Sequence, residues 1–414
     1  MMKSRSITLL LAALSIGVHH GAMAQELAPP EPRSRDVHGL RPQFPTDALL
    51  VKADKAIQNG LNFLVRTQNK DGSWGSHDPK VANLADFGFQ LRHRGSQDAV
   101  RTACTAICAE ALLNQADRTP EQQAALDLAI VDLTQTRKFA FHPGESFNTW
   151  GYGYKLGFLI RLAREPEGKK LEDEIRSAGQ ACVDGLLRFH QHNGGWSYYA
   201  GAMGDAGSMS FNTAFFGLTL AKAKEIGLEV PQGMVVDARR TVERQRAPNG
   251  SISYDSRFEN SGPHILETLG SGARTISSTL ALYHIGRYSQ RDLVRAMQVF
   301  DVSENYLESG RKRIIPHRDA AHNISGYFFF FGYNYATEAA EILGDVVPQQ
   351  RWDRFGWTML RSQEANGSWW DTPAADYGDK WGTGFAVQTL QRFVRETRRR
   401  QADGNEVADE EERE

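Results

Sequence analysis

The chain has 414 residues and a formal net charge of −2, with 41 % hydrophobic, 24 % charged and 10 % aromatic residues. This balance is that of a globular protein and excludes a disordered or collagen-like chain. The near-neutral charge argues against a nucleic-acid-binding protein, which usually carries a strongly basic domain. We therefore expect a globular protein with no nucleic-acid partner.

Residues 1–24 have the pattern of a secretory signal peptide. A basic start with Lys3 and Arg5 precedes an apolar run over residues 7–18, and Ala-Met-Ala at 22–24 forms a small-x-small cleavage site. The apolar run is too short to span a bilayer, and no other stretch is long and apolar enough. We expect cleavage near Ala24 and an exported, periplasmic or secreted protein without a transmembrane segment. The alternative is a buried N-terminal helix.

Two charged segments flank the rest of the chain. Residues 25–47 are rich in proline and charge, which predicts an extended N-terminal arm. Residues 398–414 begin with three arginines and end in an acidic run, which is typical of a solvated, disordered tail. Residues 48–397 are expected to form one domain.

A turn pattern recurs four times in residues 48–397. In each copy a helical segment leads to a glutamine, then to a glycine, and then to an aromatic or apolar residue that plugs the turn. The glycine suits a backbone of positive φ, the glutamine can bond the turn backbone, and the plug can pack on the next unit. The glutamine and plug pairs are Gln68 with Trp74, Gln191 with Trp196, Gln245 with Ile252, and Gln363 with Trp369.

Two kinds of helix are expected to alternate around these turns. Six segments are apolar nearly all round, as burial on both sides requires. These inner helices are 98–113, 148–164, 210–223, 274–286, 326–343 and 381–394. Six amphipathic segments lie between them, and these outer helices are 55–68, 121–137, 171–190, 234–246, 290–308 and 349–363. The pattern predicts an all-α fold, an α6/α6 toroid with one ring of helices inside another; an open superhelical solenoid is the alternative.

The links that lead from an outer to an inner helix are the long ones. They are 75–97, 197–209, 247–273, 309–325 and 370–380. In an alternating barrel these links fall on one rim, where all the inner helices begin. Loops on a rigid scaffold commonly carry binding groups, and helix N-termini add free N–H donors and partial positive charge. We therefore expect any site at this rim or in the cavity beneath it.

The Gln-x-x-x-Gly-Ser-Trp turns resemble the QW repeats of the terpenoid cyclase and protein prenyltransferase superfamily, over residues 50–395. The resemblance implies an α/α toroid. The chain is similar to single-toroid, exported bacterial proteins described as prenyltransferase and squalene-oxidase, or squalene–hopene cyclase, repeat proteins. The cyclases of the family carry two toroidal domains and are far longer.

The family's acid is missing from its expected positions. Bacterial cyclases protonate an alkene with the middle Asp of Asp-x-Asp-Asp-Thr-Ala, and residues 209–214 read Met-Ser-Phe-Asn-Thr-Ala instead. The eukaryotic Asp-Cys-Thr-Ala corresponds to Ala-Cys-Thr-Ala at 103–106. We find neither the Asp-rich Mg²⁺ motif nor the Asp-x-Cys pair of the family's zinc site. We therefore expect no squalene cyclisation, no cofactor and no metal, and the resemblance leaves catalysis open.

Only three cysteines occur, Cys104, Cys108 and Cys182, so a full disulfide framework is excluded. Cys104 and Cys108 are four residues apart on a predicted helix and share a face. We expect the two cysteines to serve in packing, and the alternative is that they are two ligands of a metal site.

Candidate site residues come from five repeats that a ring would bring to one mouth. The candidate ligand-binding residues are Trp150, Tyr152, His264, Arg274, Tyr327, Asp379 and Trp381. Their aromatic rings would supply contact area, and Arg274 fixed positive charge. The candidate catalytic residues are Asp205, His317 and His322, since histidine titrates near neutral pH and burial can raise an aspartate toward it.

Three functions remain open at this point. The first is a terpenoid-cyclase-like toroid that binds a small apolar or isoprenoid molecule in its central cavity. The second is a polysaccharide lyase or hydrolase acting on acidic sugars at the long-loop rim, since histidine and tyrosine near arginine suit β-elimination. The third is a non-catalytic structural or interaction module. The oligomeric state stays open in all three.

Overall fold

The computed structural model describes residues 41–77, 93–137, 139, 147–198, 207–256, 265–313, 326–374 and 376–411, without the side chains of 265–267 and 404–411. All of these residues belong to one unit, Asp36–Glu414. The signal-peptide pattern at 1–24, most of the N-terminal arm and most of the long links lie outside the described residues.

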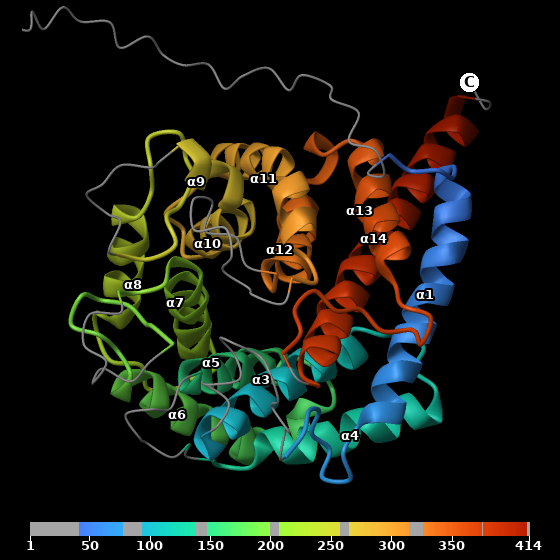
Figure 1. Ribbon diagram of the computed structural model, residues 1–414. Coiled ribbons are helices and arrows are strands. Elements are labelled where there is room, and N and C mark those ends of the chain that lie inside the picture. Colours follow the sequence, from blue (N-terminus) through green and yellow to red (C-terminus); the bar gives the residue numbers. More distant parts are fainter. Residues whose placement is uncertain are drawn as a thin grey trace, which may run out of the picture. The chain divides into compact units, whose positions relative to one another are not determined.

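The described residues place six helices in an inner ring. They are α3 (Arg94–Leu113), α5 (Asn148–Leu162), α7 (Ser210–Glu225), α10 (Gly272–His284), α12 (Phe328–Leu343) and α14 (Gly378–Glu411). Each contacts the next in this order and α14 contacts α3, so the ring is closed (Figure 1). Closure explains why these helices are apolar nearly all round: each packs against two neighbours and an outer helix.

A second set of helices surrounds this ring. They are α1 (Thr46–Thr67), α4 (Pro120–Thr134), α6 (Glu172–Arg188), α8 (Met234–Arg244), α11 (Gln290–Gly310) and α13 (Gln349–Ser362). Short helices α9 (Ile265–Gly270), η1 (Gly168–Lys170) and η4 (Gly344–Val346) lie in the connections. Strand-like pairing in the described part is limited to two isolated bridges. The all-α fold class is confirmed.

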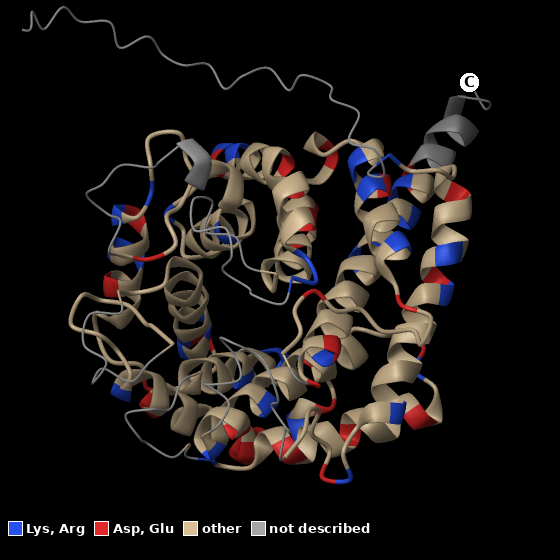
Figure 2. Ribbon diagram, viewed as in Figure 1, with Lys and Arg blue, Asp and Glu red and all other residues tan. Residues whose placement is uncertain are grey.

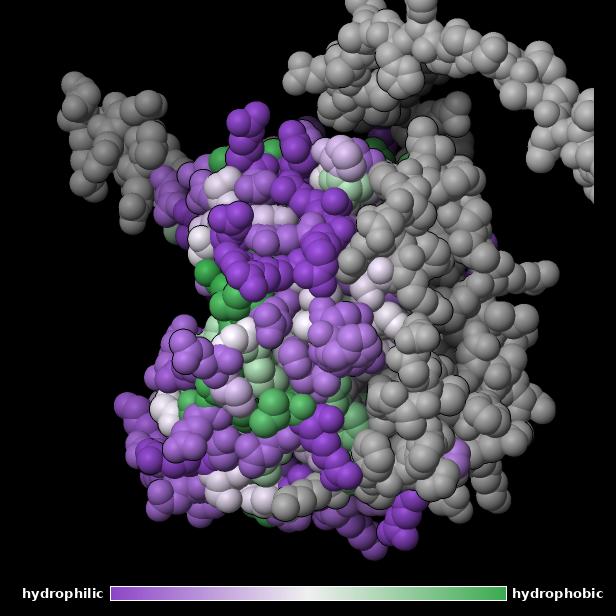
Figure 3. All heavy atoms as spheres, turned by 90° about the vertical axis from the view of Figure 1, so that its left-hand side faces the viewer, coloured by the Kyte–Doolittle hydropathy of each residue, from purple (hydrophilic) through white to green (hydrophobic). Residues whose placement is uncertain are grey.

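Figure 2 shows charged residues on the outer helices, in the connections and along α14. Hydrophobic side chains also gather between hydrophilic areas on the side of α6 and α8 (Figure 3). On these two helices Leu187 and Val236 are 45 % and 40 % exposed. Within the described ranges, no helix combines the length and apolarity needed to cross a membrane.

The repeated turns are built alike in the structure. Their glycines have φ between 87° and 95°, at Gly72, Gly194, Gly250 and Gly367. Gln68 Nε2 donates to the Gly72 carbonyl at 2.9 Å and to Ala125 of the next outer helix at 2.8 Å. The glutamine thus closes its own turn and ties it to the neighbouring unit.

The plug residues join each turn to the inner helix that follows it. The Trp74, Trp196 and Trp369 indoles are fully buried, and each donates to a carbonyl ten residues earlier at 2.8 Å. The backbone N–H of each plug also donates to a threonine hydroxyl at 3.0–3.1 Å, and these threonines are Thr105, Thr213, Thr275 and Thr383. The same hydrogen bond, repeated in four units, therefore fixes the register of four inner helices against their turns.

Both ends of the toroid differ from expectation. Helix α1 begins at Thr46 and α14 continues to Glu411, through residues expected to form a disordered tail. The arginines at the start of that segment are paired: Arg398 bonds Asp54 of α1 at 2.6 Å, and Arg399 bonds Asp345 at 3.2 Å. These pairs hold the added turns against neighbouring elements, which a charge pattern alone does not reveal.

All three cysteines are buried and free. Cys104 and Cys108 face the start of α14, with their Sγ atoms 3.7 Å from the Tyr377 carbonyl and 3.4 Å from the Lys380 carbonyl. They fill space between two inner helices, as packing residues do.

Candidate functional site

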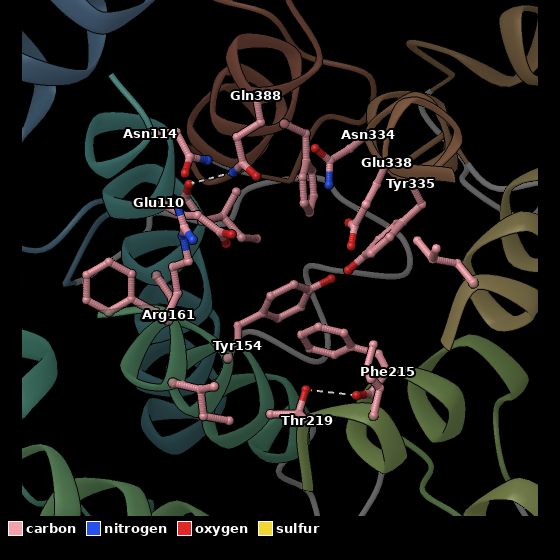
Figure 4. A pocket seen from close by; sticks show the side chains of 18 of the residues that line it. Glu110, Asn114, Tyr154, Arg161, Phe215, Thr219, Asn334, Tyr335, Glu338 and Gln388 are labelled. Atoms are coloured by element: carbon pink, nitrogen blue, oxygen red, sulfur yellow. Dashed lines mark hydrogen bonds between the residues drawn. The ribbon is translucent and has the colours of Figure 1, made fainter. Parts of the chain in front are cut away.

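A cavity of about 390 Å³ lies at the centre of the inner ring (Figure 4). Its walls come from all six inner helices, and in each helix the lining begins beyond the first turn. The first lining residues along these helices are Ala106, Tyr154, Phe215, Ser277, Asn334 and Phe385. The described cavity therefore lies beyond the rim where the inner helices begin.

The apolar part of the wall is aromatic. The rings of Tyr154 and Phe215 lie 4.8 Å apart, and Tyr154 lies 6.3 Å from Phe385. Tyr335 lies 6.5 Å from Phe215, and its hydroxyl group points toward that of Tyr154 (Figure 4). Phe331 packs on both Tyr335 and Phe385, at 4.7 and 6.1 Å, and belongs to the layer behind them.

Two carboxylates face each other across the cavity, Glu110 from α3 and Glu338 from α12 (Figure 4). Burial raises the pKa of Glu110, and the Glu338 charge adds to this, whereas Arg392 and Arg161 act against it. Burial also opposes ionisation of Glu338, but a hydrogen bond from His284 and the charge of Arg392 lower its pKa to about 2. The two environments thus shift the pKa values of Glu110 and Glu338 in opposite directions, as in acid–base pairs of enzymes.

Arg392 organises the charged part of the wall. Its guanidinium donates to Asn334 Oδ1 at 2.7 Å and pairs with Glu338 at 3.5 Å and with Glu341 at 3.3 Å. Five cations and three carboxylates line the cavity among the described residues. The cavity is thus amphipathic, with aromatic rings in one part and paired charges in another.

Three of the residues predicted from the sequence meet at the starts of the inner helices. The Trp150 ring lies 6.2 Å from Tyr327 and 6.5 Å from Trp381, each edge to face. Its indole N–H donates to Asn212 Oδ1 at 3.0 Å. Asn212 Nδ2 is buried and has no hydrogen-bond partner among the described residues.

Tyr327 also belongs to a triangle of tyrosine hydroxyls. Its hydroxyl oxygen lies 2.7 Å from that of Tyr198 and 3.0 Å from that of Tyr254, and the last two are 3.0 Å apart. Burial raises the pKa of both Tyr198 and Tyr254. The triangle ties two repeat links to the start of α12, in a layer where every ring is at least nine-tenths buried.

The other described candidates lie apart from this group. Tyr152 faces outward, with its hydroxyl accepting from the Phe139 N–H at 3.0 Å and its ring 6.2 Å from Phe189. Arg274 is fully buried and donates to the Ile252 carbonyl at 2.8 Å and to the Gly270 carbonyl at 3.1 Å. Asp379 is half-buried and pairs with Lys380 at 2.9 Å. Asp205, His264, His317 and His322 lie outside the described residues.

Sequence reasoning did not select Asp371, a fully buried carboxyl next to this layer. Its Oδ2 accepts from the Phe330 N–H at 3.1 Å near the start of α12, and its Oδ1 lies 3.5 Å from the Trp381 indole nitrogen. Burial raises the pKa of Asp371 to about 7, although both hydrogen bonds oppose the rise. The sequence feature that could have identified Asp371 is its position two residues after Trp369, the plug of the fourth repeated turn.

The threonines that bind the plugs give a structural alignment of the repeats. The family's acid precedes its threonine by two residues, and the residues at this place are Ala103, Phe211, Ala273 and Trp381. None of these side chains can donate a proton to an alkene. The absence of the family's acid therefore holds for all four aligned repeats.

No protein-family model and no curated protein sequence matches this chain. Among solved structures, a variant of type II terpene cyclase MstE from Scytonema, in complex with geranylgeranyl dihydroxybenzoate, matches 84 % of this chain and 99 % of its own. The TM-score is 0.53 at 14 % identity. The α-1,6-mannanase GH76A from Salegentibacter matches 83 % of this chain and 99 % of its own, with a TM-score of 0.50 at 10 % identity.

The chain is an α/α toroid. This confirms the fold that the resemblance to terpenoid cyclases implies. At these identities the likeness concerns the fold alone, and folds of this kind carry unrelated chemistries. The two neighbours illustrate this, since one is named a terpene cyclase and the other a mannanase.

Proposed function

We propose that this toroid binds an apolar, isoprenoid-type ligand in its central cavity. The observation that carries the proposal is the cavity of about 390 Å³ with Tyr154, Phe215, Tyr335 and Phe385 in its wall. This volume is within the range of small-molecule sites, roughly 300–1,000 Å³. Aromatic rings offer a large apolar contact area to such a ligand. The structural likeness to a cyclase solved with a geranylgeranyl compound supports the same ligand class.

Gly157 offers a direct test, because it lines the cavity and has space beside it. A Cβ built there would meet only Phe215, at an ordinary contact distance of 3.5 Å. Gly157→Leu should therefore fill the cavity without straining the fold, and leaving glycine in a helix gains about 0.5–1 kcal/mol. We expect binding of farnesol and geranylgeraniol, measured by calorimetry, to weaken at least about tenfold, which is about 1.4 kcal/mol.

The matched control is Val131→Leu on outer helix α4, where the side chain is 59 % exposed. This variant adds apolar volume outside the cavity and should bind like the wild type. If neither prenol binds the wild type, or if Gly157→Leu binds as well as the wild type, the proposed site is wrong.

We expect no cyclisation of squalene. The aligned positions of the family's acid hold Ala103, Phe211, Ala273 and Trp381, and a protonated alkene needs a strong, positioned acid. Incubation of the purified protein with squalene in detergent tests this expectation. Hopene-like products above a no-protein blank would contradict it.

An enzyme acting on acidic sugars at the long-loop rim is the second candidate. Asn212 Nδ2 favours it, because this buried amide has no hydrogen-bond partner within the described ranges, lies beside Trp150 and can bind a polar ligand. Its candidate acid–base residues are Asp205, His317 and His322. Incubation with uronic-acid polymers, followed by ultraviolet absorbance of unsaturated products or by reducing-sugar release, tests lyase and hydrolase action.

We also propose that the protein is exported after cleavage near Ala24. The support is the basic start, the apolar run and the small-x-small site in residues 1–24. N-terminal sequencing of the protein from fractionated cells should find Gln25 as the first residue outside the cytoplasm. An uncleaved chain in the cytoplasm would refute export.

A further inference from the structure

The charged groups around the central cavity balance when their partners are counted. Among the described residues, five cations and three carboxylates line the cavity. Two carboxylates outside the lining pair with two of these cations, since Arg161 bonds Glu165 at 3.0 Å and Arg164 bonds Glu225 at 2.7 Å. With them the set has five charges of each sign and no net charge. The cavity as a whole therefore favours neither an anion nor a cation.

Two charges of opposite sign in this set have no partner, Glu110 of α3 and Lys222 of α7. Both line the cavity and are half-buried, and neither side chain has a hydrogen bond or an ion pair with any residue that the structure describes. The other lining carboxylates, Glu338 and Glu341, both pair with Arg392, at 3.5 and 3.3 Å. Glu110 and Lys222 are thus the charged groups from which a ligand can gain most.

Glu110 and Lys222 act on each other without being in contact. Burial raises the pKa of Glu110, and the positive charge of Lys222 is among the charges that oppose this rise. The two helices that carry them, α3 and α7, both pack on α5 in the inner ring. The carboxylate and the ammonium therefore lie on either side of one helix, farther apart than an ion pair.

The ends of the two helices make this pair of charges asymmetric. Glu110 lies in the last turn of α3 and Lys222 in the last turn of α7. A helix C-terminus carries about half a negative charge, which adds to the carboxylate on α3 and cancels only part of the ammonium charge on α7. The α3 side of the cavity therefore favours a cation, and the α7 side keeps a positive charge for an anion.

Given the proposed function, on which this inference rests, we infer that the polar end of the ligand is a zwitterion, with an ammonium group that binds Glu110 and a carboxylate that binds Lys222. The chemical class is that of an amino acid with a long apolar chain, which lies against the aromatic wall. Both contacts are charge-assisted hydrogen bonds. A ligand with an uncharged polar end would remove water from the two side chains without replacing it by such bonds, which is unfavourable.

Four probes with one alkyl chain and different polar ends test the inference: α-aminododecanoic acid, dodecanoic acid, dodecylamine and dodecanol. Calorimetry at neutral pH, below the concentrations at which the probes form micelles, measures their affinities. The amino acid should bind about tenfold more tightly than each of the others, because each of them lacks at least one charge-assisted bond. Farnesol, measured alongside, reports on the proposed function separately.

Two variants should shift the preference for the singly charged probes in opposite directions. Lys222→Gln leaves Glu110 as the unpartnered charge, so the amino acid should bind about five- to tenfold more weakly and dodecylamine more tightly than dodecanoic acid. Glu110→Gln leaves Lys222, so the amino acid should weaken similarly and dodecanoic acid should bind more tightly than dodecylamine. A general loss of stability cannot produce these opposite shifts.

Lys224→Gln is the matched control, since Lys224 lies on the same helix as Lys222, is exposed and does not line the cavity. This variant should bind all four probes like the wild type. Circular dichroism melting of each variant shows whether it folds.

The outcomes separate this inference from the proposed function. If the amino acid binds no more tightly than the best of the other three probes while farnesol binds, the zwitterion inference is overturned and the apolar site remains. The same preference between acid and amine in both variants also overturns it, because the two side chains then do not recognise the two charges. Binding of neither farnesol nor any of the four probes overturns the proposed function itself.

Discussion

Removal of the Trp369 side chain tests whether the repeated turns hold the toroid together. The indole is fully buried and donates to the Met359 carbonyl at 2.8 Å. It also packs so closely on Gly60 of α1 that a Cβ added to Gly60 would lie 2.7 Å from the ring. Truncation of a buried tryptophan to alanine costs about 3–5 kcal/mol. The lost hydrogen bond, about 1 kcal/mol, is part of this cost. Trp369→Phe, which keeps a ring but loses the donor, should cost about 1–3 kcal/mol.

The adjacent Trp370 provides the control. It is half-buried, and Lys312 Nζ lies over its ring at 4.5 Å. Trp370→Ala should cost about 1 kcal/mol, as expected for a partly exposed cation–π contact. Urea unfolding followed by circular dichroism measures all three variants. Equal losses for Trp369→Ala and Trp370→Ala would refute the structural role of the plug.

Three further changes probe buried polar groups, each measured by the free energy of unfolding in urea. Burial raises the pKa of Asp371 to about 7 from a usual 3.8, so the carboxyl group contributes most to stability below pH 4 and this contribution is lost as the pH rises to 7. Asp371→Asn should remove this pH dependence of the free energy of unfolding, which amounts to up to about 4 kcal/mol. An unchanged pH profile in the variant would contradict the prediction. Glu304 is fully buried and pairs with Arg351 and Arg354, so Glu304→Gln should cost about 3–5 kcal/mol; a loss under about 1 kcal/mol would show that the network relaxes. Tyr327→Phe opens the hydroxyl triangle and should cost about 1–2 kcal/mol; no loss would mean that the triangle adds no stability.

The fold could be predicted because its signals are local and repeated. A turn that needs a glycine of positive φ leaves the same sequence mark at Gly72 and Gly367, whose φ values are 87° and 90°. The glycine-spaced start of α5 is equally informative: a Cβ on Gly153 would lie 2.1 Å from Phe216, so only glycine allows this approach. Such requirements constrain single positions, and a single sequence therefore displays them.

The candidate site could be predicted only in part. The ring brings Trp150, Tyr327 and Trp381 together, as their place at inner-helix starts implies. The same argument selected Arg274, but its guanidinium bonds backbone carbonyls within the fully buried turn. Position along the chain identified the rim to which a residue belongs. It did not give the direction of the side chain, which depends on the rotation of the helix about its own axis.

The repeated turns also explain why the cavity lies beyond them. In α3, α7, α10 and α14 the plug-binding threonine comes one or two residues before the first cavity-lining residue, as in Thr105 before Ala106 and Thr383 before Phe385. At that threonine the inner helix is held to the turn, because the hydroxyl accepts from the plug N–H. Past it no turn constrains the sequence, so ionisable groups such as Glu110 can face the centre. The sequence feature that such a group leaves is a lone carboxylate in an otherwise uncharged stretch, as Glu110 is within residues 102–113 of α3.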